Sequence, residues 1–213
     1  MCSSDLVLRS LAAVPRVGTQ KNAGLRFLEV DFLGAVLSGS SVDVRARENA
    51  GGFQASVTSS GTKESLLEIV GESGTGELAG DTSREWVSRY LETTPPNAIR
   101  RTQPVERRLG ELITGMEVGG VWHAAAPPAA LLSERVGPLA ARVLGLCSYL
   151  IGMEVPGLRS LFTRLRLEFA PDGPEGADRE SPLIYRLRVA RFERRLRILD
   201  LDLEVASRSG RIL

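Results

Sequence analysis

The sequence has 213 residues, with 27 basic and 26 acidic side chains, a formal net charge of +1 and 43% hydrophobic residues. These values are ordinary for a globular protein and allow one large domain or two small ones, each with a proper core. A net charge so close to zero produces no whole-protein field that would favour nucleic acid or an acidic membrane.

The cysteine and histidine content excludes two further classes. Cys2 and Cys147 do not suggest a disulfide framework, and one histidine with two separated cysteines cannot make a standard zinc site. The sequence has no run of 18 apolar residues and no signal-peptide pattern. We therefore expect a cytoplasmic protein that has no membrane span, no metal and no cofactor.

The residues at both ends of the sequence are typical of a fragment of a longer protein. Residues 1–6 resemble the translated tail of a sequencing adapter, and we expect them to be an artefact. Arg211-Ile212-Leu213 is typical of the first residues of a strand, so we expect the last strand to be truncated. The chain is thus predicted to be part of a longer polypeptide.

Residues 7–70 are predicted to form a partial first domain. The apolar segment Leu8–Val14 is expected to be the end of a helix. Four antiparallel strands follow, because apolar and polar residues alternate and Gly, Asn and Ser separate the segments. The expected strands are Leu25–Leu33, Val42–Arg47, Phe53–Val57 and Ser65–Val70.

Residues 71–104 are predicted to be a connection between domains, since Gly, Ser, Thr and Pro are dense there. Only Arg84–Leu91 has helical spacing. Asp81 lies in a segment that suits the N-cap of this short helix.

Residues 105–213 are predicted to form a second domain around a buried helix. Leu139–Ile151 is apolar on nearly every side, which is typical of a helix surrounded by protein. Gly152 is expected to end this helix in a left-handed turn, and Pro156-Gly157 to make the next corner. Upstream we expect a short helix at Val105–Ile113, a strand at Met116–Trp122 and a helical segment at Pro127–Ser133.

The second domain repeats the first. The strand sequences LRFLEVDF (Leu25–Phe32) and FTRLRLEF (Phe162–Phe169) can be superimposed with an offset of 137 residues, and both are followed by a break and two more strands. We therefore predict an internal duplication of a helix and antiparallel strands. In the last strand the apolar frame shifts by one residue, which predicts a β-bulge near Ile198–Leu199.

The apolar helix, the segment GMEVPGLRSLF (Gly152–Phe162) and the strand ending at Phe169 resemble the MaoC-like acyl dehydratases, or (R)-hydratases, of the hot-dog fold. The resemblance covers Gly137–Val205 best. It implies an α+β double hot-dog, in which each half is a curved antiparallel sheet around a central apolar helix, and the strand after that helix runs at the seam between halves. The halves would pair within the chain or in a homodimer. The resemblance also implies binding of acyl thioesters of coenzyme A or acyl carrier protein, and reversible hydration of 2-enoyl groups.

The catalytic signature of that family, an Asp followed by Asn-Pro and His, is missing from the sequence. Gly80-Asp81-Thr82 matches only its opening residues, which makes Asp81 a candidate general base beside its N-cap role. Ala140-Ala141 stands where many relatives have His-Gly.

His123 is the only histidine, so any proton transfer by histidine must use it. The alternative is a structural histidine beside Trp122. Backbone N–H groups near Gly137, at the start of the buried helix, are candidates for polarising a thioester carbonyl, although a plain helix start explains Gly-Pro equally well. Within the helix, Ser148 is expected to bond the carbonyl four residues back, and Tyr149 to pack with its hydroxyl at an edge.

Arginines form the one charge cluster of the sequence. Alternation places most of them on polar strand faces, so we expect a solvated sheet exterior, with docking of a carrier protein or of coenzyme A phosphates as the alternative. No aromatic residues are interleaved with them, so nucleic-acid binding is not expected. The cluster consists of Arg164, Arg166, Arg186, Arg188, Arg191, Arg194, Arg195 and Arg197.

Three functions remain open. The first is a dehydratase-like unit that handles acyl thioesters within a larger lipid or polyketide enzyme. The second is a non-catalytic hot-dog module for assembly or acyl-chain binding, and the third is a thioesterase on the same fold.

Overall fold

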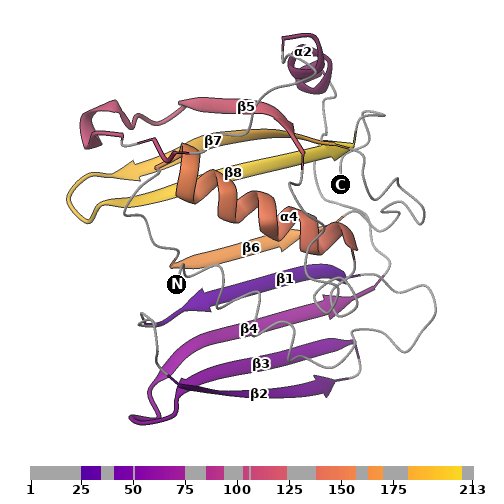
Figure 1. The fold of residues 1–213 in the computed structure, drawn as a ribbon, viewed down its shortest axis with the longest axis vertical. Helices are drawn as coiled ribbons and strands as arrows, with labels where there is room; N and C mark the ends of the chain where they lie inside the picture. Colours follow the sequence, from indigo (N-terminus) through magenta and orange to yellow (C-terminus); the bar gives the residue numbers. More distant parts are fainter. Residues whose placement is uncertain are drawn as a thin grey trace. The chain divides into compact units, whose positions relative to one another are not determined.

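The fold is taken from a computed structural model (Figure 1). The residues that it describes are 25–34, 41–49, 51–74, 85–93, 103–105, 107–123, 138–156, 163–169 and 182–207.

The chain forms two compact units, neither of which is continuous in sequence. Unit 1 consists of Met1–Ala79, Pro127–Leu144 and Leu161–Glu175. Unit 2 consists of Gly80–Ala126, Gly145–Ser160 and Gly176–Leu213.

Unit 1 contains a five-stranded antiparallel sheet in the order β2-β3-β4-β1-β6 (Figure 1). All five strands were predicted from the alternation of the sequence, and β4 continues beyond the predicted end at Val70. The strands are β1 (Leu25–Phe32), β2 (Val42–Asn49), β3 (Gly52–Ser59), β4 (Ser65–Ser73) and β6 (Arg164–Glu168).

One face of this sheet is the core of unit 1. The apolar residues of the alternating pattern are almost completely buried, as the period of two requires. At Gly71 the ring of Phe53 lies so close that an added Cβ would be 2.1 Å from it, which explains a glycine within β4. On this face the buried side chains are Leu28, Val30, Phe53, Ala55, Val57, Leu67 and Ile69, and Leu66, at the register irregularity between β3 and β4, is also buried.

β1 and β6, the two strands that the sequence repeat makes equivalent, pair directly with each other. They are antiparallel, with Leu28 opposite Leu167 and Val30 opposite Leu165. Glu29 and Arg166, which are equivalent residues of the two repeats, face each other. If a two-fold axis relates the two repeats, it passes between β1 and β6 at one pair of equivalent residues, and these two residues then lie directly opposite each other. The pairing therefore agrees with the predicted duplication and with the predicted seam strand.

Unit 2 contains a three-stranded antiparallel sheet in the order β5-β7-β8. Its strands are β5 (Glu117–Trp122), β7 (Leu183–Glu193) and β8 (Ile198–Ser207). The odd-numbered residues of β7, from Leu183 to Val189, are buried on one face. A helical turn of three residues, Leu109–Glu111, stands where a longer helix was predicted.

The short helix expected in the connection is α2 (Glu85–Thr93), and it packs on the sheet of unit 2. Its residues Trp86 and Val87 are buried against Ile184 of β7 and Ala206 of β8. An added Cβ at Gly119 of β5 would lie 2.2 Å from the ring of Tyr90, so the glycine allows the helix to approach the strand.

The predicted bulge is present on the neighbouring strand rather than near Ile198–Leu199. The register of β7 and β8 shifts between Val189 and Arg191, opposite Leu201 and Asp200. The apparent slip in the sequence has another cause, because Leu196 lies in the turn between the strands and is 65% exposed. The prediction of a bulge at Ile198–Leu199 was therefore wrong in its position.

The central apolar helix is confirmed as α4 (Pro138–Tyr149), and its residues are buried around most of its circumference. Gly152 does not end it in a left-handed turn, since the one glycine with positive φ in the described part of the chain is Gly115. Instead the helix continues into a π-helical turn, Leu150–Glu154. The N–H of Val155 donates to the carbonyl of Leu150, five residues back, at 2.9 Å.

Several predictions concern residues outside the described ranges. They are the helix remnant Leu8–Val14, the segment Pro127–Ser133, Gly157 and both chain ends. Among the described residues, no helix is long and apolar enough to cross a membrane.

Candidate functional site

Of the three predicted site residues, only His123 belongs to the described part of the chain. It follows directly after β5 and its side chain is exposed, whereas the preceding Trp122 is buried. Asp81 and Gly137 lie outside the described ranges, so their predicted roles stay predictions. Ala140 and Ala141, which stand where relatives have His-Gly, are buried within α4.

A buried polar pair occupies the end of the central helix. The hydroxyl of Tyr149 donates to Oε1 of Glu154 at 3.1 Å, and both side chains are buried. The Tyr149 hydroxyl, which was expected at an edge, thus has a buried hydrogen-bond partner. The two residues are five apart, which is the spacing that a π-helical turn brings onto one side.

The segment before β5 is bonded to this turn. Arg107 Nε donates to the backbone carbonyl of Glu154 at 2.9 Å. The N–H of Val105 donates to the carbonyl of Met153 at the same distance. The turn and the pair are thereby fixed within unit 2.

This Tyr149–Glu154 pair has two components of a proton relay, a carboxyl group and a hydroxyl group, and both side chains are buried. Sequence analysis missed Glu154, because a single acidic residue in an apolar stretch is normally expected to be exposed. The sequence offered one indication of this site, because Glu154 lies in the segment GMEV (Gly152–Val155), directly after the apolar helix.

Cys147, in the same helix, is not suited to act as a nucleophile. Its side chain is buried, and this burial raises the pKa of the thiol to about 12. A buried thiol with such a pKa is almost entirely protonated near neutral pH and is therefore unreactive.

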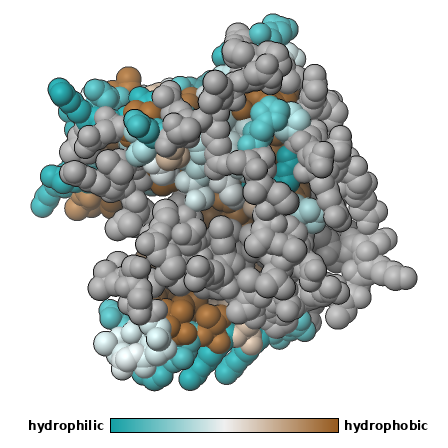
Figure 2. All heavy atoms as spheres, viewed as in Figure 1, coloured by the Kyte–Doolittle hydropathy of each residue, from teal (hydrophilic) through white to brown (hydrophobic). Residues whose placement is uncertain are grey.

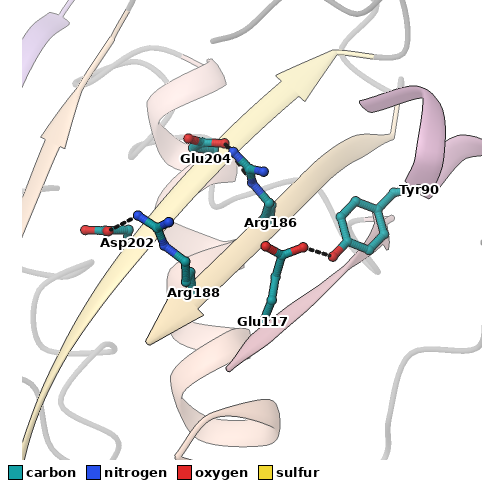
Figure 3. Close-up of polar contacts among 6 residues, drawn as sticks. All are labelled: Tyr90, Glu117, Arg186, Arg188, Asp202 and Glu204. Carbon is teal, nitrogen blue, oxygen red and sulfur yellow. Dashed lines mark hydrogen bonds and ion pairs between the residues drawn. The ribbon is translucent and has the colours of Figure 1, made fainter. Parts of the chain in front are cut away.

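The other polar constellation of unit 2 covers the face of the sheet on which α2 lies (Figure 3). Arg186 and Arg188 of β7 point to Glu204 and Asp202, which lie directly opposite on β8. Arg186 Nε donates to Glu204 Oε2 at 2.9 Å, and Arg188 Nη2 to Asp202 Oδ2 at 3.2 Å.

The helix α2 adds a second layer to this constellation. The guanidinium of Arg186 lies 5.2 Å from the centre of the Trp86 ring, and its side chain is only 29% exposed. The hydroxyl of Tyr90 donates to Glu117 Oε1 at 2.6 Å, and burial together with this bond raises the pKa of Tyr90 to about 12. These contacts hold α2 in place, so we assign the constellation a structural role.

The prediction of a solvated exterior is confirmed for Arg164, Arg166 and Arg188, whose side chains are 65%, 61% and 58% exposed. It is wrong for Arg186, because α2 covers that part of the sheet. Within the described ranges, no three His, Cys, Asp or Glu side chains are grouped closely enough to hold a metal ion.

Comparison with known proteins gives matches at the level of structure. No family model and no curated protein matches the sequence. Among solved structures, an acyl-CoA thioesterase II from Mycobacterium marinum has a TM-score of 0.58 at 10% identity, covering 99% of this chain and 84% of its own. A MaoC-like dehydratase has a TM-score of 0.54 at 11% identity, covering 90% of this chain and 72% of its own.

A third similar structure is a conserved hypothetical protein from Mycobacterium tuberculosis described as having a double hotdog fold. Its TM-score is 0.53 at 13% identity, and the match covers 97% of this chain and 75% of that one. The chain therefore has the α+β hot-dog fold, in the double form that its repeat predicted. Since the similar structures include both a dehydratase and thioesterases, the fold does not select one activity.

Proposed function

We propose that the chain is an acyl-thioester-binding hot-dog protein, which takes acyl groups carried by coenzyme A or an acyl carrier protein. The observation that carries this proposal is structural similarity over nearly the whole chain to an acyl-CoA thioesterase and a dehydratase. The buried apolar helix α4 adds support, since an acyl chain needs an apolar environment.

The first candidate reaction is reversible addition of water to a 2-enoyl thioester. His123 is the candidate acid/base, because it is the only histidine of the sequence and its exposed ring is accessible at the end of β5. The similar MaoC-like dehydratase supports this reaction class.

The second candidate is a non-catalytic module that binds acyl groups or assists assembly. One observation favours it. In the described part of the chain, no carboxylate pairs with His123, whereas general acid/base catalysis by histidine usually relies on an orienting partner. Hydrolysis of the thioester is the third candidate, and the similar acyl-CoA thioesterase supports it.

One assay separates the three candidates. Purified protein is mixed with crotonyl-CoA, and both the enoyl absorbance and the free thiol are followed. Loss of absorbance without thiol indicates hydration, and release of thiol indicates thioesterase activity. Neither change, with binding of crotonyl-CoA measured separately by calorimetry, indicates the non-catalytic module.

The His123→Ala variant tests the assigned acid/base. We expect it to lower the hydration rate by about 100-fold or more, the usual contribution of a general acid or base. Ser88→Ala, on the exposed side of α2, is the matched control and should keep the wild-type rate. Unchanged turnover in His123→Ala would remove this residue from the mechanism.

A further inference from the structure

The hairpin formed by β7 and β8 extends past β5 as a two-stranded ribbon. β5 pairs with β7 only from Leu183 to Arg188, and a last backbone bond joins Gly115 to Val189. β8 follows β7 as far as Glu193, and a four-residue turn, Arg194–Arg197, joins the two strands. We call residues 191–198 the hairpin tip (Figure 1).

Positive charge is concentrated at the hairpin tip, and three of its four arginines have no side-chain partner among the residues that the structure describes. The tip contains four arginines and a single carboxylate, Glu193, which lies 4.0 Å from Arg191. No ion pair or hydrogen bond joins the side chains of the three arginines in the turn to any residue that the structure describes. The arginines within β7 differ, since Arg186, Arg188 and Arg191 lie opposite Glu204, Asp202 and Asp200 of β8.

Two large aliphatic side chains are exposed among these arginines. Leu196 is 65% exposed and Ile198 is 43% exposed, and both are among the most exposed large apolar residues of the described ranges. Figure 2 shows hydrophilic and hydrophobic residues side by side at this end of the hairpin. Basic and apolar side chains that are exposed next to each other are the combination found in segments that lie in a membrane interface.

The backbone of the turn follows ordinary hairpin geometry. Arg197 has a φ of 56°, a left-handed conformation that glycine or asparagine adopts at lower cost than arginine. Lys63 has the same conformation, with a φ of 60°, in the connection between β3 and β4.

We propose that the hairpin tip attaches the protein peripherally to anionic phospholipid bilayers. The arginines would lie at the phosphate headgroups, while Leu196 and Ile198 would enter the boundary with the acyl chains. A bilayer suits the tip better than a folded protein partner, because a stable protein interface needs about 800 Å² on each side and a narrow ribbon offers little area. This inference does not depend on the proposed acyl-thioester function.

The test is co-sedimentation of the full chain with vesicles of phosphatidylcholine, with and without phosphatidylserine. We expect binding only to the anionic vesicles, and weaker binding at high salt. The double variant Arg194→Glu/Arg195→Glu should lose at least about tenfold in affinity. Leu196→Ser, which keeps every charge, should also weaken binding.

The matched control is Arg45→Glu/Arg47→Glu, which makes the same change of net charge at two exposed positions of β2. It should bind like the wild type. Equal losses in the two double variants would overturn the proposal, as would the absence of wild-type binding to anionic vesicles. Binding of a labelled acidic peptide that depends on Arg194 and Arg195, without vesicle binding, would assign the tip to an acidic protein instead.

Discussion

At the residue scale, burial controls the chemistry of single side chains in the central helix. The Cys147 thiol is buried, and its pKa is raised to about 12. Glu154, in the adjoining π-helical turn, is also buried but keeps the Tyr149 hydroxyl as a partner at 3.1 Å. Cys147, within α4, is therefore unreactive, whereas Glu154, in the turn that follows α4, is held in one geometry by its hydrogen bond.

Cys147 gives the first prediction, which concerns pH. The folded thiol has a pKa above that of the unfolded chain, so its contribution to stability is complete below about pH 9 and is lost as the pH rises toward 12. We expect the free energy of unfolding to fall more steeply above pH 9 in the wild type than in Cys147→Ala, measured by urea unfolding at several pH values. Parallel pH profiles for the two proteins would show that the thiol is not buried.

At the element scale, α2 is fixed by contacts that composition alone did not indicate. Its segment was expected to be part of a polar connection, but Trp86 and Val87 are buried against β7 and β8. The Trp86 ring also lies beside the Arg186 guanidinium. The helix therefore covers one face of the three-stranded sheet of unit 2.

The second prediction concerns this helix. Trp86→Ala removes the largest buried side chain of α2 and should lower the free energy of unfolding by about 3–5 kcal/mol. Ser88→Ala, on the exposed side of the same helix, should change it by less than about 0.5 kcal/mol. Chemical unfolding followed by circular dichroism measures both, and similar small effects would contradict the packing of α2 on the sheet.

The secondary structure was largely predictable because its signals are local. Alternation with a period of two is visible in the sequence, so the bounds of β1 to β4 and β6 were predicted to within a few residues. The helix α4 was predicted in the same way from its uniformly apolar sequence. The position of the bulge was not predicted correctly, because the sequence does not show that Leu196 belongs to the turn between β7 and β8. The Tyr149–Glu154 pair was missed because it depends on a π-helical turn, for which the sequence has no periodic signal.

At the scale of the whole molecule, the duplication explains how distant segments come together. β1 and β6 are far apart in the sequence, yet their equivalent residues Glu29 and Arg166 are opposed. On the polar face of these strands, Arg164 lies 2.6 Å from Asp31 and 3.6 Å from Glu29. The buried face carries Leu28 and Val30. A shift of one residue in the register would expose both side chains, so their burial requires the pairing of β1 and β6 that is observed.

The third prediction tests this register. In a Cys2→Ser/Cys147→Ala background, the pair Glu29→Cys/Arg166→Cys should form a disulfide rapidly under mild oxidation, since directly opposed residues place their Cβ atoms within bonding reach. Glu29→Cys/Arg164→Cys, shifted by two residues, is the control and should oxidise more slowly. The yields are read from non-reducing gels, and faster oxidation of the control would contradict the register.

The central claim is that this hot-dog protein binds acyl thioesters, and isothermal titration calorimetry with butyryl-CoA tests it most directly. This ligand has no enoyl bond to hydrate, and free coenzyme A is the comparison. We expect butyryl-CoA to bind more tightly than coenzyme A, since each buried methylene contributes about 0.8 kcal/mol. Equal affinities for the two ligands, or no binding of either, would contradict the claim.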